Sequence, residues 1–89
     1  MKTVGIMRYI YSVDSVEALS HEDCERLEIG DTVIKDENGS KHAYLVTYRK
    51  DDEMSLCYFD HQNVEEVYYE KNESGVWAFV VKDITHIAQ

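Results

Sequence analysis

The chain has 89 residues, of which 18 are acidic and 9 are basic, so its formal charge at neutral pH is −9. This charge disfavours direct binding to nucleic acid and to anionic membrane surfaces, and it favours a partner with a basic surface. The length fits a single domain over residues 1–89, and the 44% hydrophobic and 30% charged content is typical of a globular protein.

The first predicted element is a strand over residues 3–13, which is rich in β-branched and aromatic side chains. Both faces of this strand are largely apolar. This pattern indicates a strand that is central in a sheet or covered on both sides.

Residues 14–28 form the only stretch with helical spacing. Its apolar positions would share one face, but Asp23 falls in the middle of that face. A break at Ser20 removes the conflict, because Ser20 followed three residues later by Asp23 resembles a capping box. We therefore expect one kinked helix or two short ones, with Gly30 as the stop.

Five further strands are predicted after the helical stretch, at residues 32–36, 41–49, 54–60, 64–71 and 76–83. Asn38 and Gly39 between the first two are the strongest hairpin signal, because both residues tolerate positive φ. The turns between the strands are short, which predicts antiparallel neighbours.

The predicted fold is therefore α+β and mainly β, with an antiparallel meander of about five strands. The strands are expected to form a curled sheet or a small, partly open barrel, with the helix covering one face or plugging an open end. The segment Leu27–Val33, with the letters LEIGDTV, resembles the start of many small SH3-like barrels, in which a Gly-Asp turn leads into the first barrel strand. This resemblance implies only a fold, since such barrels serve many functions.

The candidate metal ligands are two histidines and two cysteines: His21, Cys24, Cys57 and His61. Two His and two Cys side chains could hold a tetrahedral zinc ion. The two pairs are far apart in sequence and their spacing matches no zinc motif. The favoured interpretation is therefore that both cysteines are core residues, and no metal or other cofactor is predicted.

No catalytic motif stands out. Cys57 could act as a nucleophile beside His42 or His61, but the surrounding acids would raise the pKa of its thiol and keep it protonated. The acidic runs at residues 51–53 and 65–66 are more typical of solvated turns than of catalytic carboxylates. The sequence therefore predicts that the protein is not an enzyme.

Most of the negative charge is concentrated in residues 14–37, which hold nine acids and two bases and so carry a net charge of −7. Strict alternation along residues 41–49 also places two tyrosines on one strand face, and tyrosine is common at protein interfaces. The predicted partner-binding residues are Glu17, Glu22, Glu25, Glu28, Asp31, Tyr44 and Tyr48.

Together these patterns predict a small, non-catalytic protein-interaction module that binds another protein through its acidic helix region and exposed tyrosines. We expect a cytoplasmic protein with reduced thiols, of a kind common in bacteria and prophages, because no export signal or membrane segment is evident. A second hypothesis is an acidic mimic of nucleic acid that inhibits a DNA- or RNA-binding protein. The charge and strand pattern also leave open a zinc-binding or small-ligand-binding barrel, and a homodimer formed through an uncovered strand edge.

Overall fold

A computed structural model describes residues 10–87 of the chain. The elements are one short helix and six strands: β1 (Ile10–Val13), α1 (His21–Arg26), β2 (Thr32–Glu37), β3 (Ser40–Arg49), β4 (Glu53–Phe59), β5 (Asn63–Lys71) and β6 (Trp77–His86). The strands form one sheet in sequence order, from β1 at one edge to β6 at the other.

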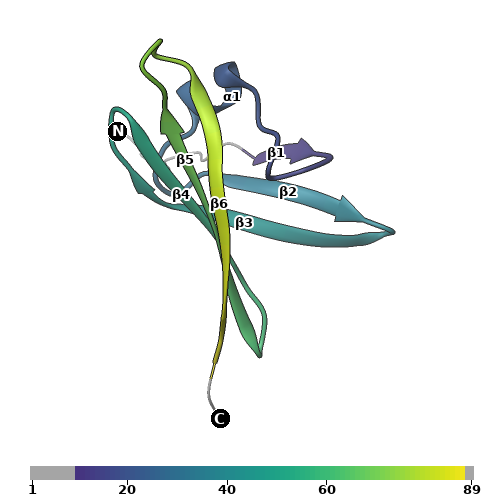
Figure 1. The fold of residues 1–89 in the computed structure, drawn as a ribbon. Helices are drawn as coiled ribbons and strands as arrows, with labels where there is room; N and C mark the ends of the chain where they lie inside the picture. The colour runs from purple at the N-terminus through teal and green to yellow at the C-terminus, as the bar shows by residue number, and fades with distance from the viewer. Residues whose placement is uncertain (1–9, 88–89) are drawn as a thin grey trace, which may run out of the picture.

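Five of the six strands form the predicted antiparallel meander. β2 to β6 pair successively as antiparallel neighbours, whereas β1 pairs in parallel with β2. A parallel pair needs a crossover connection. Residues 14–31 provide it and carry α1 across one face of the sheet (Figure 1).

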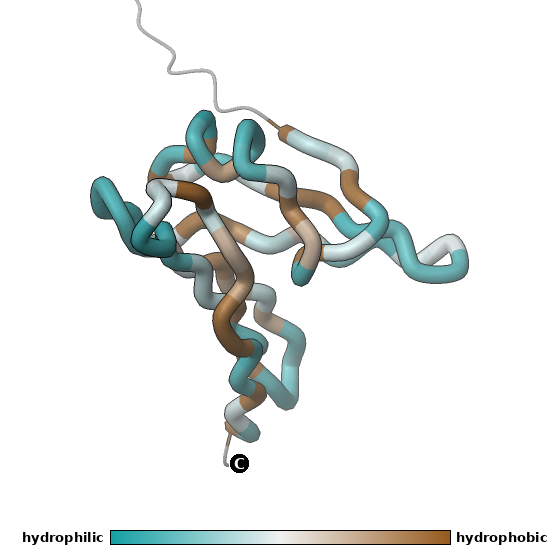
Figure 2. The backbone as a smooth tube through the Cα atoms, turned by 45° about the horizontal axis from the view of Figure 1, so that its top comes forward, coloured by the Kyte–Doolittle hydropathy of each residue, from teal (hydrophilic) through white to brown (hydrophobic). Residues whose placement is uncertain are grey.

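The sheet is curled and open, as expected for a mainly β α+β fold, and it does not close into a barrel. The β2–β3 hairpin projects to one side, while the β4–β5 turn and the end of β6 project to another (Figure 1). Figure 2 shows hydrophilic residues at the hairpin tips and, in the strand that leads to the C-terminus, a hydrophobic stretch that is followed by hydrophilic residues.

The hydrophobic core lies between the crossover segment and the covered face of the sheet. Its buried side chains come from the crossover and from five strands: Val16, Leu19, Cys24, Leu27, Val33, Tyr44, Val46, Met54, Leu56, Val67, Tyr69 and Trp77. The apolar positions with helical spacing in residues 14–28 are Val16, Leu19, Cys24 and Leu27, and all four belong to this core.

The helix is shorter than predicted, although its start was identified from the sequence. Ser20 is the N-cap, and its side-chain oxygen accepts a hydrogen bond from the Asp23 N–H at 3.1 Å. The helix ends at Arg26 with Leu27 as C-cap, before Gly30, whose φ of 95° belongs to the turn into β2. The structure thus has one short helix that begins after the predicted break at Ser20, and residues 14–19 and 27–28 of the predicted helical stretch are not helical.

The first strand also differs from its prediction. Residues 3–9 lie outside the described part of the chain. The described part, Ile10–Val13, pairs with β2 alone and so lies at an edge of the described sheet, where a central strand was one of the expectations.

A β-bulge reverses the side-chain alternation near the end of β3. Val46 pairs with Leu56 and Tyr48 pairs with Ser55, so Thr47 is an extra residue without a partner of its own in the strand register. One inserted residue turns every following side chain to the other face of the sheet. Tyr48 therefore lies on the face opposite Tyr44, and the prediction that they share a face is wrong.

Candidate functional site

The face of the sheet opposite α1, called the outer face below, contains a pocket of about 380 Å³. Met54 and Leu56 of β4 point into the core, so Ser55 between them points to the outer face. The side chains that define this tyrosine–glutamate pocket are Tyr48, Glu53, Ser55, Glu66, Tyr68 and Glu70.

A row of three residues across neighbouring strands forms the centre of the pocket. Tyr48 of β3 pairs with Ser55 of β4, and Ser55 pairs with Tyr68 of β5. Ser55 is small and forms the floor, while the two tyrosines stand on either side of it. Two strand spacings separate the tyrosine backbones by roughly 10 Å. This leaves room for a group between the rings.

Three carboxylates surround this row. Glu53 pairs directly with Glu70 on the same side of Ser55, and Glu66 lies one row away on the other side. Like charges placed directly opposite each other in a sheet are destabilising. Within the described residues none of the three makes an ion pair with a basic side chain at 4 Å or less.

Two further contacts define the electrostatics of the pocket. The Glu66 carboxylate accepts from the hydroxyl of Tyr68 and raises the pKa of Tyr68 to about 12, so this phenol stays neutral. The Lys50 ammonium lies 5.8 Å from the centre of the Tyr48 ring. The Tyr48 ring therefore already attracts a cation from the chain itself.

Ser55 is the buried polar residue of the pocket. It is only 4% exposed as a residue, and none of the hydrogen bonds found among residues 10–87 involves its hydroxyl, although this oxygen is not one of the fully buried atoms without a partner and is therefore open to the pocket. The floor of the pocket thus offers an unused hydrogen-bonding group.

In the acidic helix region, by contrast, several acidic side chains form contacts with other residues of the chain. Glu25 accepts a hydrogen bond from the Trp77 Nε1–H at 2.6 Å and pairs with Lys71 at 3.1 Å. Asp31 is 3% exposed and accepts from the Glu28 N–H at 2.9 Å. The expectation that Asp31 belongs to an exposed binding surface is therefore wrong.

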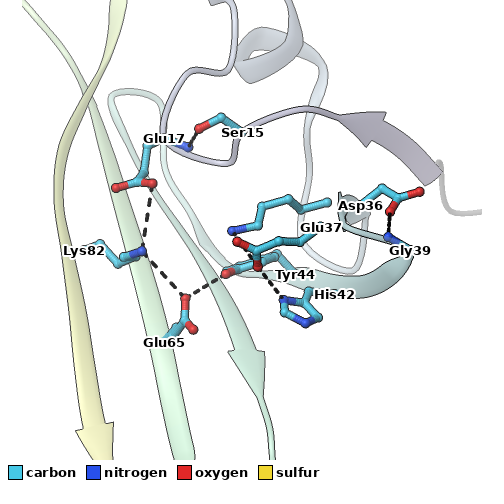
Figure 3. A network of polar contacts seen from close by, with 10 residues as sticks. Ser15, Glu17, Asp36, Glu37, Gly39, His42, Tyr44, Glu65 and Lys82 are labelled. Atoms are coloured by element: carbon cyan, nitrogen blue, oxygen red, sulfur yellow. Dashed lines mark hydrogen bonds and ion pairs between the residues drawn. The ribbon is translucent and has the colours of Figure 1, made fainter.

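The other three acids of that set are exposed. Glu22 and Glu28 face solvent on the crossover segment. Glu17 is exposed as well, but its carboxylate lies 3.9 Å from the Lys82 ammonium (Figure 3). Trp77 also donates its backbone N–H to His21 Nδ1 at 3.2 Å, so the helix is attached to β6 by several polar contacts.

Tyr44 is fully buried and cannot present its ring to a partner. Its hydroxyl donates to Glu65 at 2.7 Å, and Glu65 in turn lies 4.0 Å from Lys82. Figure 3 shows this chain of contacts from β3 to β5, β6 and the crossover segment. Burial and the Glu65 carboxylate hold the pKa of Tyr44 well above its usual range. The prediction of an exposed Tyr44 is wrong, whereas Tyr48 is 38% exposed.

The four candidate metal ligands are not brought together. His21 accepts a hydrogen bond from β6, Cys24 lies in the core, and the Cys57 thiol contacts the Thr47 hydroxyl at 3.4 Å on the outer face. His61 lies in the turn between β4 and β5. In the part of the chain that the structure describes, no three His, Cys, Asp or Glu side chains are placed to hold a metal ion.

Both thiols are held in the protonated form. Burial raises the pKa of Cys24 to about 12, and burial also raises the pKa of Cys57. A protonated thiol is a poor nucleophile. These environments are those of structural cysteines.

The outer edge of β6 is a second notable surface. Among the described residues, six of the eleven exposed large hydrophobic side chains lie between residues 76 and 87: Val76, Phe79, Val80, Val81, Ile84 and Ile87. β6 is the last strand of the sheet, and no described strand pairs with its other side. Long apolar edge strands promote association with other chains.

Sequence reasoning identifies Tyr48 of the pocket and misses the other five residues. Glu53 and Glu66 belong to acidic runs, which the sequence predicts to be solvated turns. The sequence signal that could have identified these residues is the alternation of side chains along β4 and β5. It places Glu53, Ser55, Glu66, Tyr68 and Glu70 on one face. The missing information is the register between the strands.

Comparison of the chain with protein-family models, with curated proteins and with solved structures finds no match. The six-residue α1, the one helix in residues 10–87, is too short to cross a membrane.

Proposed function

We propose that this protein is a non-catalytic interaction module that binds a basic segment of a partner protein at the tyrosine–glutamate pocket. The observation that carries the proposal is the charge of this pocket. Three carboxylates surround a hollow between two tyrosine rings, and no described basic side chain forms an ion pair with any of them.

The chemistry of the pocket supports binding of a positive charge. Carboxylates and the faces of neutral phenol rings both attract cations. The repulsion between the paired Glu53 and Glu70 would be relieved by a cation placed between them. The pocket is open on a broad sheet face, so a side chain of another protein could reach it.

The proposal modifies the expectation from the sequence. The basic partner and the participation of exposed tyrosine are retained, but the contact surface moves from the helix to the opposite face of the sheet. Nucleic-acid mimicry through residues 14–37 has less support, because Glu25 and Glu17 lie beside lysines and Asp31 is buried. We place the protein in the cytoplasm as part of the same proposal.

The test compares two triple variants with the same change in charge. One variant combines Glu53→Gln, Glu66→Gln and Glu70→Gln in the pocket. The control combines Glu22→Gln, Glu28→Gln and Glu73→Gln, which are all exposed and lie outside the pocket. Binding of a short basic peptide is measured by isothermal titration calorimetry at low and high salt.

We expect the pocket variant to lose binding and the control to retain most of it. Binding to the unmodified protein should weaken with salt, since ions screen exposed charges. An equal loss in the two variants would show that net charge alone attracts the peptide, and it would contradict the proposed site.

A further inference from the structure

We propose that the group recognised by the tyrosine–glutamate pocket is the guanidinium of an arginine side chain. This inference rests on the proposed function and makes it more specific. Three features of the pocket carry it: the spacing of its aromatic walls, the arrangement of its carboxylates and the hydroxyl of its floor.

The two aromatic walls favour a flat cation. The backbones of Tyr48 and Tyr68 are separated by the width of two strand spacings, with the small Ser55 between them. A planar guanidinium can stack on a tyrosine ring on each side, whereas an ammonium is a compact and strongly hydrated charge. The geometry therefore suits arginine better than lysine.

The carboxylates lie around the edge that such a stacked guanidinium would present. Glu53 and Glu70 form one side and Glu66 forms the other. A guanidinium has five N–H donors in one plane and can bond to carboxylates on more than one side. A lysine ammonium has three donors on a single atom and could not reach both sides at once.

The floor supplies an additional acceptor. Ser55 lines the floor, none of the hydrogen bonds found among residues 10–87 involves its hydroxyl, and this hydroxyl can accept one N–H of a bound guanidinium. The cavity of about 380 Å³ lies near the lower end of the range for ligand pockets. It is suited to one long side chain and not to a folded segment.

Lys50 shows that the Tyr48 ring attracts a cation. Its ammonium lies 5.8 Å from the centre of the Tyr48 ring. We expect it to compete weakly with an incoming cation. Removal of this charge by Lys50→Ala should therefore tighten binding of arginine, roughly twofold if the competing contact resembles other exposed cation–π pairs.

The experiment uses the full chain and three capped tripeptides that differ only in the central residue: arginine, lysine or citrulline. Citrulline has nearly the shape of arginine and no charge. Binding is followed by NMR, through the ring resonances of Tyr48 and Tyr68. We expect the arginine peptide to bind roughly fivefold more tightly than the lysine peptide, and the citrulline peptide to bind far more weakly than either.

Two variants separate stacking from charge. The double substitution Tyr48→Leu and Tyr68→Leu should abolish the preference for arginine over lysine while some charge-driven binding remains. Ser55→Ala should weaken arginine binding without changing the three carboxylates. Denaturant midpoints of both variants, followed by Trp77 fluorescence, confirm that they are folded.

N-acetylarginine amide is tested in parallel, because equal affinity for it would indicate a free guanidinium compound as the ligand and not a peptide.

The outcomes of this experiment are distinct. Equal binding of arginine and lysine peptides, lost in the Glu53, Glu66 and Glu70 variant, would overturn the arginine inference and leave the proposed function standing. Failure of every cationic peptide to bind would overturn both. Tight arginine binding that is unchanged by the tyrosine and serine substitutions would place the site elsewhere and overturn the inference as well.

Discussion

Tyr69 connects the sheet to the crossover segment through its hydroxyl group. The hydroxyl donates to the Val16 carbonyl at 2.6 Å and accepts from the Leu19 N–H at 2.9 Å, and all three residues are buried. The loop between β1 and α1 thus satisfies two backbone groups with one side chain. This is why Val16 and Leu19 can be buried without being helical.

Removing this hydroxyl should be strongly destabilising. Tyr69→Phe leaves a buried carbonyl and a buried N–H without their partner, and we expect the free energy of unfolding to fall by about 2–4 kcal/mol. The measurement is urea unfolding followed by Trp77 fluorescence. Tyr48→Phe is the control, because the exposed Tyr48 should change the stability by less than about 0.5 kcal/mol. Equal effects of the two substitutions would contradict the structural role of the Tyr69 hydroxyl.

The buried thiol and phenol also predict how stability depends on pH. Burial raises the pKa of Cys24 from 9.0 to about 12, and it raises the pKa of Tyr69 from 10.0 to about 12. The folded protein therefore favours the neutral forms. This contribution is complete below about pH 9 and is lost as the pH rises through the folded-state values.

The expected result is a free energy of unfolding that falls steadily at alkaline pH. Urea unfolding at a series of pH values between neutral and strongly alkaline measures it. In Cys24→Ala the part of the decline that begins near the ordinary thiol pKa should be absent, although the variant will be less stable at every pH. A decline of the same shape in both proteins would assign the pH dependence to other groups.

At the scale of elements, α1 is a six-residue helix whose stability depends on interactions at its two ends. Ser20 caps its first turn, and acidic Glu22 and Asp23 lie where the helix dipole favours negative charge. So short a helix is not stable by itself. Its packing through Cys24 and its polar contacts with Trp77 complete its stabilisation.

The cap can be tested with a matched pair of substitutions. Ser20→Ala removes the acceptor for the Asp23 N–H and should lower the free energy of unfolding by about 1 kcal/mol. Ser20→Asp retains an acceptor at the same position and should change it far less. Thermal unfolding followed by circular dichroism measures both variants. If Ser20→Asp is as destabilising as Ser20→Ala, the cap does not explain where the helix begins.

The same elements show which parts of the structure can be predicted from the sequence. The meander was predicted because alternation and turn residues are local signals: Asn38 and Gly39 adopt the expected positive φ values of 54° and 87°. The bulge at Thr47 was missed because it exists only relative to the partner strand. The pocket was missed for the same reason, since it combines residues of β3, β4 and β5 across two registers.

The length of α1 illustrates a second limit of structure prediction from the sequence. Residues 14–19 have helical spacing, yet Tyr69 binds the backbone of this segment from a strand fifty residues away in the chain. Such a tertiary contact overrides local propensity. Only the capping signal at Ser20 is local, and that part of the prediction is confirmed.

At the scale of the whole molecule, the distribution of charge separates two surfaces. The net charge is −9, but the segment Val76–Ile87 along the outer edge contains one lysine and one aspartate and is otherwise uncharged at neutral pH. The most apolar edge of the sheet is thus also the least charged. A second copy of the chain could approach this edge with less repulsion than elsewhere.

We therefore predict weak self-association through β6. The wild-type protein should show a dimer that grows with concentration in analytical ultracentrifugation. Ile84→Lys places a charge on the edge strand and should shift the protein to monomer. Ile29→Lys is the control, because Ile29 is 54% exposed, close to the 53% of Ile84, and lies on the crossover segment. Equal loss of dimer in both variants would indicate that added charge, and not the β6 edge, controls association.

Salt should affect this association and peptide binding in opposite directions. Two copies that each carry a charge of −9 repel each other, so screening should increase the dimer fraction as salt is added. Binding of a basic peptide at the tyrosine–glutamate pocket is an attraction between opposite charges, and the same salt should weaken it. One salt series on one protein sample, read by ultracentrifugation and by peptide titration, therefore distinguishes the two surfaces. If both associations weaken together, the β6 edge is not where the copies meet, because an apolar and nearly neutral contact has no electrostatic attraction for salt to screen.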